Sequence, residues 1–110
     1  MATLDWHVLV VDDDQALLEE VEGWLKSNDI RVSTAPDGAA ALALLKQGLD
    51  PDVILSDIKM PTVDGFEFFD AVRENAAWNS TRFVFLVEHD DEAFLKHAEE
   101  MGIDSPLLKP

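Results

Sequence analysis

The chain has 110 residues, of which 47% are apolar, a composition that fits one globular domain and excludes a disordered segment. Its 8 Lys and Arg against 23 Asp and Glu give a formal charge of −15, which disfavours direct binding of nucleic acid or of an anionic membrane. The sequence has no cysteine, no apolar run near the length of a membrane span and no signal-peptide pattern, so we expect a cytoplasmic protein without disulfides.

Five short apolar runs rich in β-branched or aromatic residues predict five strands. They lie at 7–11, 31–35, 53–56, 83–87 and 106–109. Between them, apolar residues recur at the spacing of amphipathic helices. These helical patterns cover 17–25, 40–45, 66–72 and 94–101. Strands that alternate with helices indicate an α/β fold with a parallel sheet and right-handed crossovers.

Residues at the expected helix ends support these boundaries. Asp37, Asp64 and Asp90 precede three of the helical patterns and are suitable N-caps. Gly48 and Gly102 follow two of the patterns, where a left-handed residue commonly ends a helix.

The pattern ends with the fifth strand, and no closing helix follows it before Pro110. A parallel sheet normally has both faces covered. We therefore expect a single domain over 1–110 that either was cut from a longer protein after the fifth strand or has its bare face covered by a partner, such as a second copy in a homodimer.

Charged residues follow three of the predicted strands. Asp12, Asp13 and Asp14 follow the first strand, Asp57 ends the third and Lys109 ends the fifth. Parallel strands place these ends on one edge of the sheet, where open α/β sheets bind ligands. Taken singly, such residues are more often turn, cap or surface residues. Carboxylates about 4 Å apart repel by on the order of 4 kcal/mol per pair at an effective dielectric near 20, which a bound cation would offset.

The chemistry of this residue set favours one kind of ion. Oxygen ligands without histidine or cysteine select a hard cation, and so few carboxylates suit Mg²⁺, which retains several waters and shares phosphate oxygens. A carboxylate beside a metal ion and a lysine is equipped to accept a phosphoryl group as an acyl phosphate. The sequence therefore predicts a magnesium-dependent phosphoryl-acceptor site.

Three stretches carry a resemblance to a known family. "VLVVDDD", "DVILSDIKMPTVDGFEF" and "LLKP", in this order and spacing, resemble the receiver domains of bacterial two-component response regulators. The D-x-x-M-P-x-x-D-G stretch from Asp57 to Gly65 is the most specific part. The resemblance implies a flavodoxin-like, doubly wound sheet of strand order 2-1-3-4-5, here without the family's fifth helix.

The resemblance also implies roles for individual residues. Asp57 would be the phosphoacceptor, Asp13 a direct magnesium ligand and Asp12 a ligand acting largely through water. Lys59 would lend its backbone carbonyl to the metal, and Lys109 would pair with the phosphoryl group. The donor would be a phosphohistidine on a sensor histidine kinase or a phosphotransfer protein, and the domain would catalyse only its own phosphorylation and dephosphorylation. The kinase, the output domain and the pathway are not specified by the sequence.

Departures from the family pattern keep a second function open. Val87 stands where the family has a hydroxyl that binds the phosphoryl group, and the following Glu88 either faces the site or points to solvent. Pro106 replaces the aromatic residue that normally moves with that hydroxyl. His89, with Lys59, occupies a position expected to tune dephosphorylation. The alternative is a receiver-like interaction module that works without phosphorylation.

A third function class is a phosphohydrolase whose nucleophile lies in a D-x-D motif. Asp12 and Asp14 fit that motif superficially. The motif calls for Thr or Val where Ala16 stands, and such enzymes normally have a larger chain with a cap domain.

Overall fold

A five-stranded parallel sheet organises the computed structural model, which describes residues 5–88, 92–103 and 106–109. The strand order is β2-β1-β3-β4-β5, which confirms the predicted flavodoxin-like, doubly wound α/β fold. The strands are β1 (His7–Val11), β2 (Arg31–Ala35), β3 (Val53–Asp57), β4 (Arg82–Val87) and β5 (Leu107–Leu108). Strands β3 and β4 are one residue longer than predicted, and β5 has only 2 residues, fewer than the predicted 106–109.

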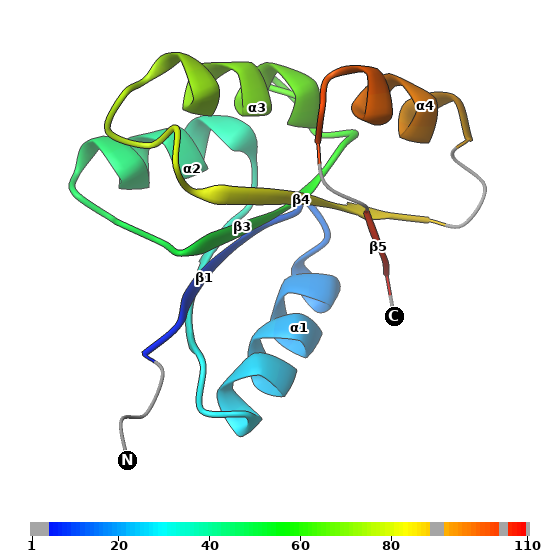
Figure 1. Ribbon diagram of the computed structural model, residues 1–110. Helices are drawn as coiled ribbons and strands as arrows, with labels where there is room; N and C mark the ends of the chain where they lie inside the picture. The colour runs from blue at the N-terminus through cyan, green and yellow to red at the C-terminus, as the bar shows by residue number, and fades with distance from the viewer. Residues whose placement is uncertain (1–4, 89–91, 104–105, 110) are drawn as a thin grey trace.

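Four helices cover the two faces of the sheet unequally. They are α1 (Gln15–Ser27), α2 (Gly38–Lys46), α3 (Gly65–Glu74) and α4 (Glu92–Glu100). Helices α2, α3 and α4 lie on one face, and α1 lies on the other (Figure 1). No helix follows β5 among the described residues, as predicted. None of the helices in this part of the chain combines the length and apolar character needed to cross a bilayer.

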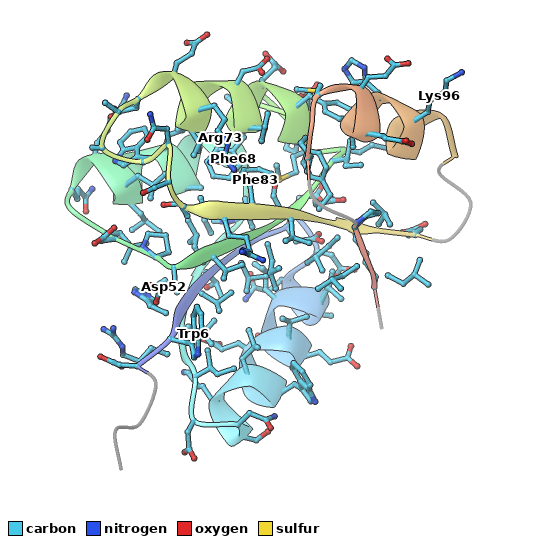
Figure 2. All side chains as sticks on the ribbon, in the orientation of Figure 1. Trp6, Asp52, Phe68, Arg73, Phe83 and Lys96 are labelled. Carbon is cyan, nitrogen blue, oxygen red and sulfur yellow. The ribbon has the colours of Figure 1, made fainter. Side chains whose placement is uncertain are left out.

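Alternation along the strands divides the core into two layers. Leu9 and Val11 face the layer under α2, α3 and α4, whereas Val8 and Val10 face α1. The larger layer is held by aromatic contacts: the Phe83 ring lies 5.1–5.5 Å, between ring centroids, from its neighbours Phe68, Phe69 and Phe85. Figure 2 labels Phe68 and Phe83 among the side chains of this layer. The contacts with Phe69 and Phe85 are edge-to-face, a packing that stabilises a core beyond simple area burial.

The helix ends largely follow the predicted capping residues. The Asp37 carboxylate accepts the Ala40 amide at 2.7 Å, and Asp64 forms a capping box with Glu67. Gly48 and Gly102 have φ values of 107° and 76°, the left-handed geometry expected at these stops. The predicted N-cap Asp90 lies outside the described residues.

The face that carries α1 is less completely covered at the β5 edge. Leu107 pairs with Leu86 of the α1 layer and is 50% exposed, and among the described residues only α1 packs on this side of the sheet. Part of the β5 edge on this face is therefore accessible to solvent.

Gly65 allows the start of α3 to approach the end of β3 closely. A Cβ at Gly65 would collide with the carbonyl oxygen of Asp57 and would lie 2.7 Å from Cα of Ile58. The Gly65 amide donates to the Ile58 carbonyl at 2.7 Å, which fixes this contact. The loop after Asp57 thus requires glycine for its packing.

Replacing this glycine tests the close approach. We expect Gly65→Ala to lower the free energy of unfolding by about 1–3 kcal/mol, because backbone atoms must shift to admit the methyl group. The matched control is Gly23→Ala, on α1 with no atom within 4 Å of its Cβ position. It should raise stability by about 1 kcal/mol through helix propensity. Urea unfolding measures both, and equal effects of the two substitutions would contradict the packing argument.

Candidate phosphoryl-acceptor and metal site

A cavity of about 250 Å³ opens at the carboxyl ends of the strands. All five charged residues that the sequence placed on this edge line it. Its lining consists of Asp12, Asp13, Asp14, Asp57, Ile58, Lys59, Leu86, Glu88 and Lys109. Strands β1 and β3 are neighbours in the sheet, so the residues at their ends meet without any long excursion of the chain.

Backbone amides hold the two buried carboxylates of this cavity. Asp12 follows β1 and is fully buried, and its Oδ1 accepts the Asp14 amide at 2.9 Å. Asp57 ends β3 and is 8% exposed, and its Oδ1 accepts the Ile58 amide at 2.8 Å. Because both donors belong to the main chain, both carboxylates are preoriented by the fold.

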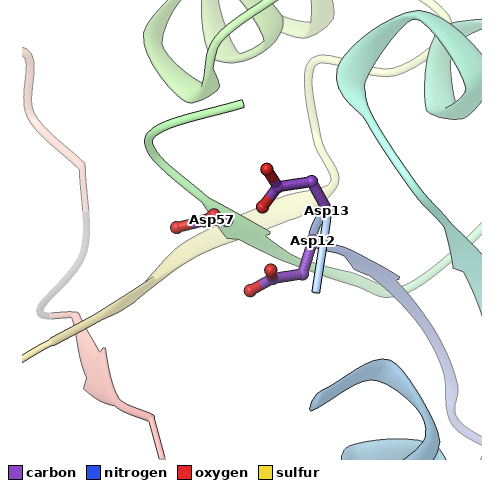
Figure 3. Close-up of side chains that lie close together, drawn as sticks. All are labelled: Asp12, Asp13 and Asp57. Atoms are coloured by element: carbon purple, nitrogen blue, oxygen red, sulfur yellow. The ribbon is translucent and has the colours of Figure 1, made fainter. Parts of the chain in front are cut away.

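Three carboxylates converge at one point. One oxygen each from Asp12, Asp13 and Asp57 can be chosen so that all three lie within 4.8 Å of one another. Figure 3 shows these side chains turned toward a shared space beyond the ends of β1 and β3. Asp13 is exposed, whereas the other two are buried, so the cluster is open to solvent on one side.

Lys109 balances part of this negative charge. Its Nζ lies 3.0 Å from Oδ2 of Asp12 and 3.1 Å from Oδ1 of Asp57. Its backbone amide donates to the Val87 carbonyl at 2.9 Å, which fastens the residue beside β4. One ammonium group therefore serves two buried carboxylates.

The pKa values of both partners respond to this crowding. Burial raises the pKa of Asp57 above its usual range, the Asp12 charge raises it further, and the bond from Lys109 opposes the shift only partly. Burial alone would lower the pKa of Lys109, but its contacts with Asp12 and Asp57 outweigh burial and raise it. The site is therefore short of positive charge.

The residues present fit a divalent cation. Asp12 Oδ2 is buried and receives no hydrogen bond of regular geometry from the described residues, although the Lys109 ammonium lies in ion-pair range of it. The donor set consists of oxygens, which suits Mg²⁺ rather than a softer metal. Asp12, Asp13 and Asp57 could hold the ion, together with the Lys59 backbone carbonyl that the resemblance implies.

The remaining predicted positions fall in different surroundings. Lys59 and Glu88 line the cavity and are exposed, so Glu88 both borders the site and contacts solvent. Val87 is 2% exposed and packs into the core layer under α3 and α4. Pro106 is half-buried just before β5. His89 lies outside the described residues.

Asp14 has a role that the sequence analysis did not assign. It is the N-cap of α1, where its Oδ1 accepts the Leu17 amide at 3.2 Å. The signal for this role was available, because an aspartate directly before the helical pattern is a preferred N-cap. The three consecutive aspartates therefore have different roles. Asp12 and Asp13 belong to the carboxylate cluster, and Asp14 caps α1.

Comparison with known proteins gives a consistent match. The family model described as response regulator receiver domain matches residues 8–110. Response regulator Rre1 of Synechocystis is 35% identical over 94% of this chain, and the chain spans 45% of that protein. Protein PilG of Pseudomonas aeruginosa is 33% identical over 94% of the chain and 76% of PilG. The structure of chemotaxis protein CheY4 of Vibrio cholerae superposes with a TM-score of 0.86 at 33% identity, covering 96% of this chain and 88% of CheY4.

The raised pKa of Asp57 predicts a pH-dependent effect of removing its charge. Below its ordinary pKa of 3.8 the carboxyl is protonated in both the folded and the unfolded chain. As the pH rises through the folded-state pKa, ionisation in the crowded site lowers the stability of the wild type. Asp57→Asn should therefore be more stable at pH 7 without metal, by on the order of 1 kcal/mol.

Urea unfolding between pH 3 and 7, about the range in which carboxyl groups titrate, measures this difference. The difference in the free energy of unfolding between Asp57→Asn and the wild type should shrink toward zero at the lowest pH values. Asp70→Asn, which removes an exposed charge on α3, is the control and should show little change. A wild type that is more stable than Asp57→Asn at neutral pH in chelator would contradict the charge argument.

Proposed function

Because the chain belongs to the response regulator receiver domain family, we propose that it accepts a phosphoryl group on Asp57 in a Mg²⁺-dependent reaction and signals through changed partner binding. The observation that carries this proposal is the convergence of Asp12, Asp13 and Asp57 beside Lys109. A module of this kind modifies itself and has no turnover of an external substrate beyond its phosphodonor.

The chain's own groups supply most of the chemistry. A carboxylate oxygen of Asp57 attacks phosphorus, the bond from phosphorus to the donor nitrogen breaks, and the donor histidine leaves with a proton. Lys109 neutralises charge on the transferred group, because its ammonium already lies 3.1 Å from Asp57. When bound, Mg²⁺ supplies further positive charge for the phosphoryl oxygens. The fold holds the nucleophile in place through the Ile58 amide.

The partners follow from the same proposal. The phosphodonor would be a histidine kinase or a phosphotransfer protein in the cytoplasm, and the receiver of the signal would be an output domain or a separate protein. The chain spans less than half of the Synechocystis regulator, so whole-protein activities of such relatives are not assigned to it. A homodimer that covers the bare face beside β5 stays a prediction from the sequence.

A second function is favoured by one observation. Val87 is buried and apolar at the position where the family carries a hydroxyl, so it offers no hydrogen bond to a phosphoryl group. A hydrogen bond to a charged group contributes roughly 1.5–3 kcal/mol, and its loss weakens the coupling between phosphorylation and shape. The alternative is therefore an interaction module whose partner binding does not depend on phosphate.

Phosphorylation of Asp57 is the direct test of the proposed function. With phosphoramidate or acetyl phosphate and Mg²⁺, intact-mass measurement should show the addition of one phosphoryl group. Asp57→Asn should abolish it, and Asp13→Asn should slow it by weakening metal binding. Mg²⁺ at 100 times its Kd should also stabilise the wild type by about 2.7 kcal/mol in thermal unfolding. An unmodified wild type at saturating donor and metal would refute the proposal.

Two substitutions at Val87 separate the two functions. Val87→Thr keeps the side-chain shape and adds the hydroxyl, so beryllofluoride with Mg²⁺ should bind about tenfold more tightly, the factor expected for one added hydrogen bond to an anion. Val87→Ala adds no hydroxyl and is the control.

Amide NMR spectra report how far the change spreads. The receiver proposal expects wild-type shifts in β4 and α4 on beryllofluoride binding, and these should grow in Val87→Thr. Shifts confined to the cavity in the wild type, together with partner binding unaffected by Asp57→Ala, would favour the phosphate-independent module.

A further inference from the structure

Glu88 lies in the lining of the cavity. Its position in the sequence alone left open whether it faces the site or points to solvent. It directly follows β4, is exposed and lines the cavity together with Asp57 and Lys109. In the described part of the chain, no hydrogen bond or ion pair engages its carboxylate. Its charge therefore acts on whatever enters the cavity.

Three of the other four carboxylates that line the cavity have local compensation, and the exceptional one, Asp13, belongs to the metal-binding cluster. Asp14 caps α1, and Asp12 and Asp57 each accept a backbone amide and lie within 3.1 Å of the Lys109 ammonium. Like Asp13, Glu88 has no comparable contact among the described residues, but it lies outside the cluster of three acids that could hold a metal ion. Its carboxylate repels an anion that enters the cavity shared with Asp57 and attracts a cation.

We propose that Glu88 is a specificity-determining residue that selects phosphodonors by charge. Its carboxylate disfavours small, freely diffusing anionic donors and favours a phosphoryl group delivered from a protein surface with positive charge of its own. The inference rests on the proposed function of Asp57 as phosphoacceptor and adds a residue that discriminates small anionic donors from a donor carried by a protein. The net charge of −15 acts in the same direction, because it repels small anions and attracts a basic partner.

The test compares two small donors of similar size and different charge. Acetyl phosphate is mainly dianionic at neutral pH, whereas phosphoramidate carries less net negative charge. In Glu88→Gln the rate with acetyl phosphate relative to phosphoramidate should rise about fivefold at low salt, the scale of one exposed charge contact in water. The increase should shrink as ionic strength is raised.

A binding measurement provides a second readout with the opposite sign. Isothermal titration calorimetry should show Mg²⁺ bound about threefold to fivefold more weakly by Glu88→Gln, since a nearby carboxylate attracts the cation. Beryllofluoride should bind more tightly once Mg²⁺ is saturating. Damage to the fold would weaken the binding of both Mg²⁺ and beryllofluoride. Weaker Mg²⁺ binding together with tighter beryllofluoride binding therefore identifies the effect of the Glu88 charge. The control is Glu74→Gln, which removes an exposed acid at the C-terminal end of α3. The opposite end of this helix, at Gly65, is the one that lies beside Asp57.

The outcomes distinguish this inference from the proposed function. Label on Asp57 from both donors, with a donor ratio that Glu88→Gln leaves unchanged, would overturn the inference and leave the proposed function standing. The same ratio change in Glu74→Gln would also overturn it, because the effect would then be one of net charge. Absence of label in every protein with both donors would overturn the proposed function and the inference with it.

Discussion

One ammonium group shared by two buried carboxylates governs the chemistry of this protein. Lys109 lies within 3.1 Å of both Asp12 and Asp57, and Asp13 adds a third carboxylate on the open side. The positive charge is insufficient for the three acids, and burial amplifies the imbalance because the local dielectric is low. The fold maintains the imbalance, since both buried acids are held by main-chain amides at the ends of central strands. A site arranged in this way attracts a cation, and a bound cation in turn favours the binding of an anion.

Most of the fold could be predicted because its signals are local. Short apolar runs and helical patterns located every strand and helix of the described residues, and single residues such as Asp64 and Gly48 marked helix ends. The order of the strands was supplied by the family resemblance, since pairing depends on contacts between distant segments. The short length of β5 was not foreseen, because the apolar run around Leu107 and Leu108 suits a longer strand, while only 2 residues pair with β4.

The site residues were predictable as a set, but their contacts were not. Parallel strands place Asp12, Asp57 and Lys109 on one edge by topology alone. Which acid Lys109 pairs with depends on side-chain conformations that only the assembled cavity decides. The orientation of Glu88 is a similar case, since either outcome suited the sequence. Val87 offers no hydroxyl to the site, but it is buried and packs in the core. A residue can therefore lack the site's expected chemistry and still suit the fold.

The direction of the helices also reduces the electrostatic cost of three consecutive aspartates. Since every strand is parallel, α1 begins at Gln15 directly after these residues, and α3 begins at Gly65 beside the carbonyl of Asp57. The amino end of a helix carries roughly half a positive elementary charge from its aligned peptide dipoles. Helix α1 has no acidic residue in its own first turn, so the preceding aspartates receive this field. The backbone thus contributes electropositive character that a count of ionisable groups does not register.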